Sequence, residues 1–404
     1  MALLMAHMNV ARVENGRLQV DRKFLVGIQR YAERIRRPLL SVHPEATGRT
    51  RIMDAVEIPC SELAFEVMTV KVDGWGRTLP ADIPRLRNAI ARSDLVYGRG
   101  LGAPELARRL GVPYVLVLEY DLASEVVAST SQTANPLRRA SRAARCAWHH
   151  LTVEIPEMRR AHSLHCNGFP VYAAARRHNP SRLLFLDSRL SEDILISREQ
   201  LAARLAGGAG RPLRLLYSGR YERMKGSDDA VRVGLECLRR GLDVEMHCYG
   251  HGNLRSEMEA LAATAAQPDR ILIHDSIPFP ELVKIAQACD VFVCCHRQSD
   301  PSCTYLESLG AGLPIVGYDN TMWHSLREES GAGYCLPIGN FAAVADAVEH
   351  LASDHRTLAA MSVNARAFAE AHCYEREFAK RIDALNAIVC SSRSYQQQPV
   401  GVTS

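Results

Sequence analysis

Hydrophobic and polar positions alternate along the second half of the chain in a pattern typical of repeated βα units. Short β-branched or aliphatic runs occupy 213–219, 243–250 and 270–277, and longer helical patterns lie between them. Strands that alternate with helices in this way form a parallel sheet with helices on both faces. We therefore predict a doubly wound α/β domain in this half.

The first half alternates less cleanly, but it still predicts a second α/β domain. A strong buried-strand pattern covers 112–121, and a polar and then helical segment follows at 123–161. The composition shifts to Gly, Ala and Pro towards residue 210, which is typical of a boundary between domains. Close to this boundary, Asp187 and Arg189 are candidates for an ion pair across the hinge. The predicted units are a domain at 1–195, a domain at 196–385 and a disordered tail at 391–404.

Composition narrows the class of protein. The 404 residues are 47% hydrophobic and 23% charged, which is the balance of a globular chain and excludes a disordered or fibrous one. No run reaches the ~18 apolar residues that a membrane-spanning helix needs, and the first ten residues lack the features of a signal peptide. We therefore expect a cytoplasmic protein. The 12 cysteines form no C-x-x-C pair, so we expect neither a zinc cage nor disulfides.

Charge is unevenly distributed. The net charge is +4, but residues 1–195 hold 28 Lys+Arg against 20 Asp+Glu, which favours an anionic partner. Four arginines recur at helical spacing over 138–145, close to Trp148. This stretch is a candidate for peripheral contact with the inner face of a membrane, and a solvated basic helix is the alternative. Aromatic residues make up only 6% and do not interleave with the basic runs, so we expect no nucleic-acid partner.

The segment YSGRYERMKG, from Tyr217 to Gly226, carries the clearest candidate chemistry. Gly219 ends a predicted strand, and the cations Arg220 and Lys225 follow ahead of a helix. In open α/β sheets ligands bind at the carboxyl ends of strands, and a helix N-terminus offers free amides to an anion. Arg220 and Lys225 are therefore candidates for binding a diphosphate. The alternative is a solvated loop with two surface cations.

A second informative segment begins at Asp300 and reads DPSCTYLESLGAGLPIVG. A proline and Ser302 suit the start of a helix, where the backbone amides of Cys303 and Thr304 face an anion. Glu307 follows about one turn later, and a carboxylate there can accept the two hydroxyls of a ribose. An exposed helix glutamate is the alternative.

Four blocks, SGRYERMKG, HDSIPFPELVKIAQACDVFV, SCTYLESLGAGLPIVG and AGYCLPIGN, resemble in order and spacing the C-terminal domain of family 4 glycosyltransferases of the GT-B fold. The resemblance covers about residues 190–390. It implies two facing Rossmann-like, doubly wound parallel-sheet domains, the N-terminal one for an acceptor and the C-terminal one for a nucleotide-sugar. It also implies that Arg220 and Lys225 bind the donor diphosphate and that Glu307 binds the ribose. The residues that would border the nucleotide base are Gly250, Ser276 and Ile277.

The chain also departs from the family pattern. The family usually has two glutamates separated by seven residues, but Ser299 stands eight positions before Glu307. Asp300, one place later, is either a substitute for the glutamate that contacts the donor sugar or a helix N-cap. The family's histidine after a buried strand is absent too. Glu119 ends the strand at 112–121 and is a candidate catalytic carboxylate, although a strand-end acid can simply cap a loop, and Arg99 in YGRG is a candidate contact for an anionic acceptor.

These observations predict a glycosyltransferase that moves a sugar from a UDP- or GDP-linked donor to a glycan or lipid-linked acceptor. Retention of the anomeric configuration is implied by the resemblance. Arg220, Lys225 and helix N-termini would stabilise the charge on the leaving diphosphate, so we expect no metal and no further cofactor. Two alternatives stay open: a nucleotide-sugar-binding protein without catalysis, and a GT-B sugar-nucleotide epimerase.

Overall fold

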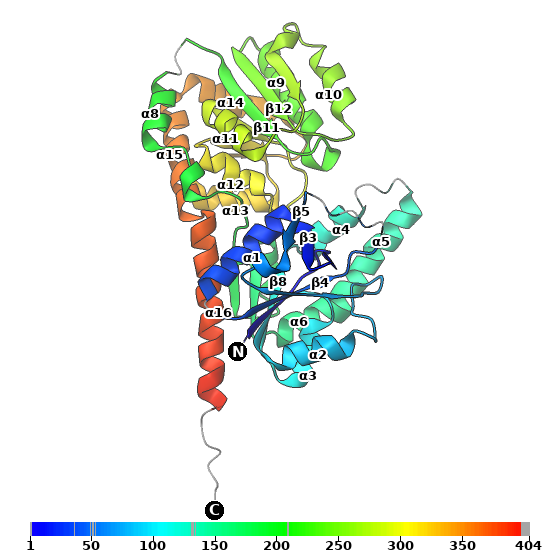
Figure 1. The fold of residues 1–404 in the computed structure, drawn as a ribbon. Helices are drawn as coiled ribbons and strands as arrows, with labels where there is room; N and C mark the ends of the chain where they lie inside the picture. Colours follow the sequence, from blue (N-terminus) through cyan, green and yellow to red (C-terminus); the bar gives the residue numbers. More distant parts are fainter. Residues whose placement is uncertain are drawn as a thin grey trace, which may run out of the picture.

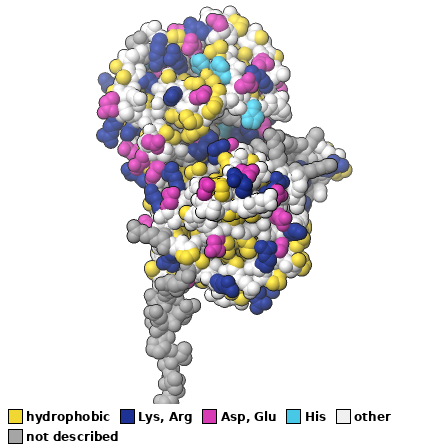
Figure 2. Space-filling view, in the orientation of Figure 1, with side chains coloured by type: hydrophobic (Ala, Val, Ile, Leu, Met, Phe, Trp, Pro, Cys, Tyr) yellow, Lys and Arg dark blue, Asp and Glu magenta, His cyan; other side chains and the backbone are white. Residues whose placement is uncertain are grey.

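Two parallel sheets, one in each half of the chain, dominate the structure, which is a computed structural model (Figure 1). It describes residues 2–396 apart from 36, 49, 51, 53, 131, 132, 134, 208 and 209. The two sheets lie in separate lobes that meet at a waist, where Lys and Arg side chains are visible (Figure 2). The predicted fold class, two doubly wound α/β domains, is confirmed.

The N-terminal sheet has seven parallel strands in the order β10-β9-β8-β7-β1-β4-β6. Its central strands are buried on both faces, which explains near-continuous apolar runs such as YVLVL in β8. The strands are β1 (Ala2–Ala6), β4 (Leu39–Pro44), β6 (Glu66–Val70), β7 (Ser93–Gly98), β8 (Tyr114–Leu118), β9 (Ser163–Asn167) and β10 (Arg182–Phe185). The helices around them are α1 (Arg22–Ile35), α2 (Ile83–Ala91), α3 (Ala103–Leu110), α4 (Leu122–Thr130), α5 (Pro136–His149), α6 (Ile155–Arg160) and α7 (Phe169–Ala175).

A small antiparallel sheet, which the sequence did not predict, accompanies the N-terminal sheet. It pairs β3 (Arg17–Asp21) with β2 (Arg12–Glu14) on one side and with β5 (Ala55–Pro59) on the other. Leu18 and Val20 of β3 are buried with residues of α1. This sheet therefore holds the start of α1 in place.

The C-terminal sheet has six parallel strands in the order β13-β12-β11-β14-β15-β16. Three of them fall within the runs predicted at 213–219, 243–250 and 270–277. The strands are β11 (Leu213–Ser218), β12 (Val244–Tyr249), β13 (Ile271–His274), β14 (Val291–Cys294), β15 (Ile315–Tyr318) and β16 (Gly333–Leu336). The helices are α8 (Arg198–Ala206), α9 (Ser227–Arg239), α10 (Arg255–Ala262), α11 (Phe279–Ala288), α12 (Cys303–Gly310), α13 (Thr321–Ser330), α14 (Phe341–Ser353) and α15 (His355–Ala371).

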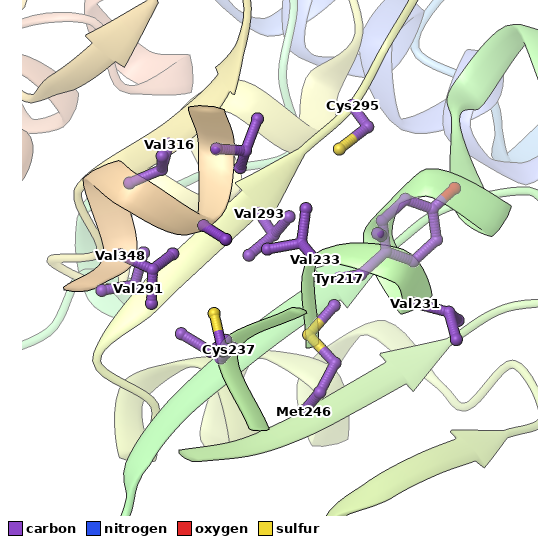
Figure 3. Packing of buried hydrophobic residues seen from close by; sticks show 14 of the residues in the cluster. Tyr217, Val231, Val233, Cys237, Met246, Val291, Val293, Cys295, Val316 and Val348 are labelled. Carbon is purple, nitrogen blue, oxygen red and sulfur yellow. The ribbon is translucent and has the colours of Figure 1, made fainter. Parts of the chain in front are cut away.

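The core of this second domain lies between its sheet and α9 and α14 (Figure 3). Val233 of α9, Met246 of β12, Val293 of β14 and Val348 of α14 are all fully buried there. Burying an aliphatic side chain of this size stabilises the fold by about 1.5–3 kcal/mol. The core thereby fixes the strand ends that carry the site.

The last helix, α16 (Tyr374–Gln396), leaves the C-terminal domain and packs on the N-terminal one beside α1 (Figure 1). Phe378, Ile382 and Leu385 are buried in one cluster with Leu3 of β1 and Tyr31 of α1. The predicted division at 195/196 stays a prediction. The chain passes from the N-terminal to the C-terminal domain and returns to the N-terminal domain with α16. The part of the predicted disordered tail beyond α16 lies outside the described residues.

Two absences apply to the described part of the chain. All twelve cysteines are free of disulfides, and most of them are buried. None of the described helices has both the length and the apolar character that crossing a bilayer requires.

Candidate functional site

The carboxyl ends of the two sheets approach each other across the waist. Lys23, at the start of α1, donates from Nζ to Asp187 Oδ2 at 2.8 Å and to Cys303 Sγ, at the start of α12, at 3.5 Å. A Cβ on Gly168, after β9, would lie 3.1 Å from the Cβ of Pro301. Loops of both domains therefore touch at this edge.

The C-terminal sheet has a topological switch point between β11 and β14, because the chain continues from β11 to β12 on one side and reaches β14 on the other. Ligands of open α/β sheets bind in the crevice at such a point. Lys225 follows β11, Asp300 follows β14, and Lys225 Nζ donates to Asp300 Oδ2 at 2.6 Å. Gly226 has φ +59°, and a Cβ there would lie 2.0 Å from the carbonyl oxygen of Cys295. Only glycine allows this contact between the two loops.

The Lys225–Asp300 ion pair is largely withdrawn from water. The side chains are 7% and 15% exposed, respectively. Burial alone raises the pKa of Asp300, but the charge and hydrogen bond of Lys225 outweigh it, so the pKa lies below the usual value. Asp300 is therefore charged at neutral pH. Ser302 is the N-cap residue of α12, and its side chain makes no capping hydrogen bond.

Arg220, the other predicted diphosphate ligand, lies nearer to solvent. Its Nη1 is 3.0 Å from Glu222 Oε2, and its side chain is about half exposed. The hydroxyl of Tyr217 donates to the carbonyl oxygen of Arg220 at 2.9 Å, and the amide of Gly219 donates to Tyr249 O at 3.0 Å. The loop is thus held at its base while the guanidinium remains accessible.

Glu307 lies one turn into α12 and is only 10% exposed, so it is not an exposed helix glutamate. Arg189 donates from Nε to Glu307 Oε1 at 2.9 Å, and its guanidinium lies 4.1 Å from the ring centre of Phe279. The expected pair between Asp187 and Arg189 is wrong, because Asp187 accepts from Lys23 instead. The contact between Arg189 and Glu307 has no local signal in the sequence, since 118 residues separate the two partners.

The start of α12 brings Cys303 and Thr304 close to the same crevice. Burial raises the pKa of the Cys303 thiol to about 11, so the thiol stays neutral. The Ser302 hydroxyl donates to Thr304 Oγ1 at 3.2 Å rather than to the helix end. The first amides of α12 thus carry the positive end of the helix dipole towards the crevice.

The residues predicted to border a nucleotide base lie on neighbouring loops. A Cβ on Gly250 would lie 1.9 Å from the carbonyl oxygen of Gly219, so the loops after β11 and β12 touch there. Ser276 is exposed and Ile277 half-buried in the loop after β13. Tyr221 Oη lies within hydrogen-bond distance of two carbonyl oxygens, Cys248 O of β12 at 2.8 Å and His274 O of β13 at 2.6 Å. The three loops therefore form one connected surface.

Glu119, after β8, faces this surface from the N-terminal domain. Its Oε2 accepts a hydrogen bond from Asn167 Nδ2 at 2.8 Å. Burial raises the pKa of the neighbouring Tyr120, and the charges of Asp300 and Glu119 raise it further, whereas Arg220 and Arg99 oppose the rise. Charges affect a pKa in this way only over short distances, so candidate residues of both domains lie close together around Tyr120.

His296 is a candidate that the sequence did not indicate. It follows β14 and is 1% exposed, and neither ring nitrogen has a hydrogen-bond partner among the residues that the structure describes. Burial lowers its pKa to about 3, and the positive charge of Lys225 adds to this effect. A neutral, unpartnered imidazole beside the Lys225–Asp300 pair can bind a ligand hydroxyl.

Two facing doubly wound parallel-sheet domains define the GT-B fold of glycosyltransferases. Residues 212–354 match the family Glycosyl transferases group 1. The resemblance to family 4 glycosyltransferases is thereby confirmed.

Individual relatives agree with this fold and family. A 2-deoxystreptamine glucosyltransferase from Streptomyces kanamyceticus is 28% identical over 25% of this chain and 26% of its own length. The amylovoran biosynthesis glycosyltransferase AmsK from Erwinia amylovora is 22% identical over 47% of this chain and 49% of its own. The alignments thus span half or less of these curated relatives. HepE from Anabaena, solved in complex with UDP, superposes with a TM-score of 0.64 at 14% identity over 97% of this chain and 99% of its own.

Proposed function

We propose that the protein is a glycosyltransferase that moves a sugar from a nucleotide-diphosphate sugar to an acceptor held between the two sheets. The observation that carries the proposal is the cluster of Lys225, the start of α12 and Glu307 around the β11/β14 switch point. A diphosphate requires cations and free amides, and a ribose requires a carboxylate. The family match over 212–354 supports the same activity.

In this proposal the donor is held by residues of the C-terminal domain alone. Lys225 and Arg220 bind the diphosphate, and the first amides of α12 stabilise its charge as the bond to the sugar breaks. Glu307 releases Arg189 and accepts the ribose hydroxyls. The base contacts are assigned to Gly250, Ser276 and Ile277, and no metal takes part.

The Lys225–Asp300 pair has to open when the donor binds. A buried lysine without an anionic partner destabilises the fold, and Asp300 supplies that partner while the site is empty. The diphosphate then takes the place of the carboxylate on Lys225. Asp300 becomes free to accept hydrogen bonds from hydroxyls of the donor sugar, beside His296.

The acceptor lies on the N-terminal side, where Glu119 is the candidate to orient its hydroxyl. We infer retention of the anomeric configuration, with attack on the face from which the diphosphate leaves. A UDP-linked donor is favoured over a GDP-linked one, because HepE was solved with UDP and with UDP-glucose. A polysaccharide or lipid-linked acceptor is supported by AmsK, which is named for amylovoran biosynthesis.

Peripheral membrane contact is the second part of the proposal, and α5 supports it. This helix projects from the side of the N-terminal domain (Figure 1). Leu137 and Leu151 are 80% and 62% exposed, and Trp148 lies 6.1 Å from the exposed Trp75 between ring centres. Arginines interleave with these apolar side chains, which is typical of surfaces that bind anionic bilayers. We leave Arg142 out of this proposed membrane contact, since its guanidinium donates to Ser129 O and to Thr133 Oγ1 on its own domain.

Titration calorimetry with UDP, GDP and ADP, followed by UDP-sugar turnover, tests the activity. We expect UDP to bind the wild type, and we expect Lys225→Ala and Glu307→Ala to lose at least about tenfold in affinity. Lys284→Ala and Glu281→Ala, on the surface of α11, are matched controls. Binding without turnover on any glycan or lipid-linked acceptor indicates the non-catalytic alternative. An epimerised donor formed without acceptor indicates the epimerase.

A further inference from the structure

Three metal-ligating side chains from three elements converge beside the end of β15. Asp319 directly follows β15, His324 lies in α13, and Cys335 belongs to β16. Their ligand atoms all lie within 4.8 Å of one another. Asp319 Oδ1 and His324 Nδ1 are 2.8 Å apart. Across the part of the chain that the structure describes, no other group of three or more such side chains meets this criterion.

Sheet register, rather than chance side-chain placement, brings Cys335 and Asp319 together. Gly317 pairs with Cys335 across β15 and β16. Side chains alternate between faces along a strand, so residue 319 points to the same face as residue 317. A Cβ on Gly317 would lie 2.3 Å from the carbonyl oxygen of Cys294 on β14, so β15 is packed closely against its other neighbour at this position. The amide of Asp319 donates to Leu336 O at 2.7 Å, which fixes the end of β15 against β16.

His324 is presented by a helix start that is equally well fixed. The side chain of Asn320 caps α13 by accepting from the Trp323 amide at 3.0 Å, and it donates to His296 O at 3.1 Å. Trp323 is fully buried, and its Nε1 donates to Tyr334 O at 3.0 Å. These hydrogen bonds therefore fix the start of α13, as the Asp319 amide fixes the end of β15, before any ion binds. Such preorganisation reduces the ordering cost of binding.

The ligand set selects the metal. A thiolate, an imidazole and a carboxylate suit Zn²⁺, whereas Mg²⁺ and Ca²⁺ require oxygen ligands. Metal–ligand distances of about 2.0–2.3 Å place tetrahedral ligands about 3–4 Å apart, so only small side-chain shifts are needed. The side chains of His324 and Asp319 are 57% and 45% exposed, which leaves an entry path and room for a water as fourth ligand.

We propose that Asp319, His324 and Cys335 form a Zn²⁺ site with three protein ligands and one position open to solvent. The site lies apart from the Lys225–Asp300 pair, and the transfer reaction proposed above does not use it. It is nevertheless linked to that region, because the amide of Thr321 donates to Ser299 Oγ at 3.0 Å. A test of this metal site therefore does not depend on whether the proposed sugar transfer is correct.

Cobalt substitution tests the site on the full-length, tag-free protein after removal of metals with a chelator. Co²⁺ bound by a thiolate gives a charge-transfer absorption in the near ultraviolet, and Zn²⁺ should displace it. Cys335→Ser and His324→Ala remove one ligand each. Cys390→Ser and His355→Ala, at exposed positions, are matched controls for adventitious binding.

We expect one equivalent of Co²⁺ with a thiolate band in the wild type and in both controls. The affinity for Zn²⁺ should fall at least about 100-fold in Cys335→Ser and in His324→Ala. Zn²⁺ should raise the melting temperature of the wild type and not of these two variants. A wild type that binds no metal, a band that survives in Cys335→Ser, or a band lost in Cys390→Ser overturns the proposal. If Cys335→Ser does not fold, His324→Ala decides, because its side chain is exposed and an unchanged affinity rejects the site.

Discussion

Replacing Asp300 with asparagine should make UDP bind more tightly while turnover falls. In the empty site, Asp300 Oδ2 accepts a 2.6 Å hydrogen bond from the buried Lys225, and a diphosphate has to displace it. A hydrogen bond to a charged group contributes about 1.5–3 kcal/mol. Asparagine keeps the shape of the side chain but removes the competing charge. Because about 1.4 kcal/mol corresponds to a tenfold change in affinity, we expect UDP to bind about 10–100-fold more tightly.

The assay is titration calorimetry with UDP, alongside steady-state turnover of the UDP-sugar. Loss of the carboxylate removes the proposed contact with the donor sugar, so kcat should fall at least about tenfold in the same variant. Asp243→Asn, on an exposed carboxylate that pairs with Arg270, is the matched control and should change neither quantity. An Asp300→Asn variant that binds UDP as weakly as the wild type, or more weakly, refutes the displacement of Asp300 by the diphosphate.

Three further predictions concern stability, the ribose and the membrane. Lys225→Met leaves Asp300 buried and unpaired, so the free energy of unfolding should fall by about 3–5 kcal/mol at pH 7.5. In the wild type the pKa of Asp300 is lowered, so the stabilisation by its ion pair persists above the usual aspartate pKa. In Lys225→Met burial without the lysine raises the pKa of Asp300. The difference in unfolding free energy between the wild type and the variant should therefore narrow by up to about 1.4 kcal/mol per pH unit as the pH falls. Denaturant unfolding at pH 7.5 and pH 5 measures this, and a deficit that does not change with pH contradicts it. Glu307→Gln should abolish the preference for UDP over 2′-deoxy-UDP, which competition calorimetry measures, and a retained preference rules out ribose binding by Glu307. Neutralising Arg138 and Arg139 should weaken binding to phosphatidylglycerol vesicles by about 1 kcal/mol per arginine, with phosphatidylcholine vesicles as the control, and unchanged sedimentation removes the membrane contact.

The fold could be predicted from the sequence mainly where strands are buried on both faces. The strand β8, inside the run at 112–121, reads YVLVL because helices cover both sides of the central parallel strands. The small sheet around β3 was missed, because charged and polar residues interrupt its strands, which read RVE, RLQVD and AVEIP. The return of α16 was missed as well, since an amphipathic helix does not specify which domain it covers.

The candidate site was predictable where one short segment carries several functional groups. Lys225 and Glu307 each lie in such a segment, and the structure brings both segments to one switch point. Lys23, His296 and the pairing of Arg189 with Glu307 were missed because their environments depend on contacts between distant parts of the chain. Lys23 and Cys303, for example, are 280 residues apart. No local pattern records a contact of this kind.

The position of α16 has a consequence for the order of folding during synthesis. Leu3 is translated long before Leu385 and Val389, yet all three are buried in one cluster. The N-terminal domain therefore cannot complete its packing until residue 389 has been translated, whereas the last strand of the C-terminal sheet is already complete at residue 336. At about 5–20 residues per second, the first domain waits many seconds for its last helix. During that interval an apolar groove beside α1 stays open to chaperones, and truncation before residue 374 should leave it open permanently.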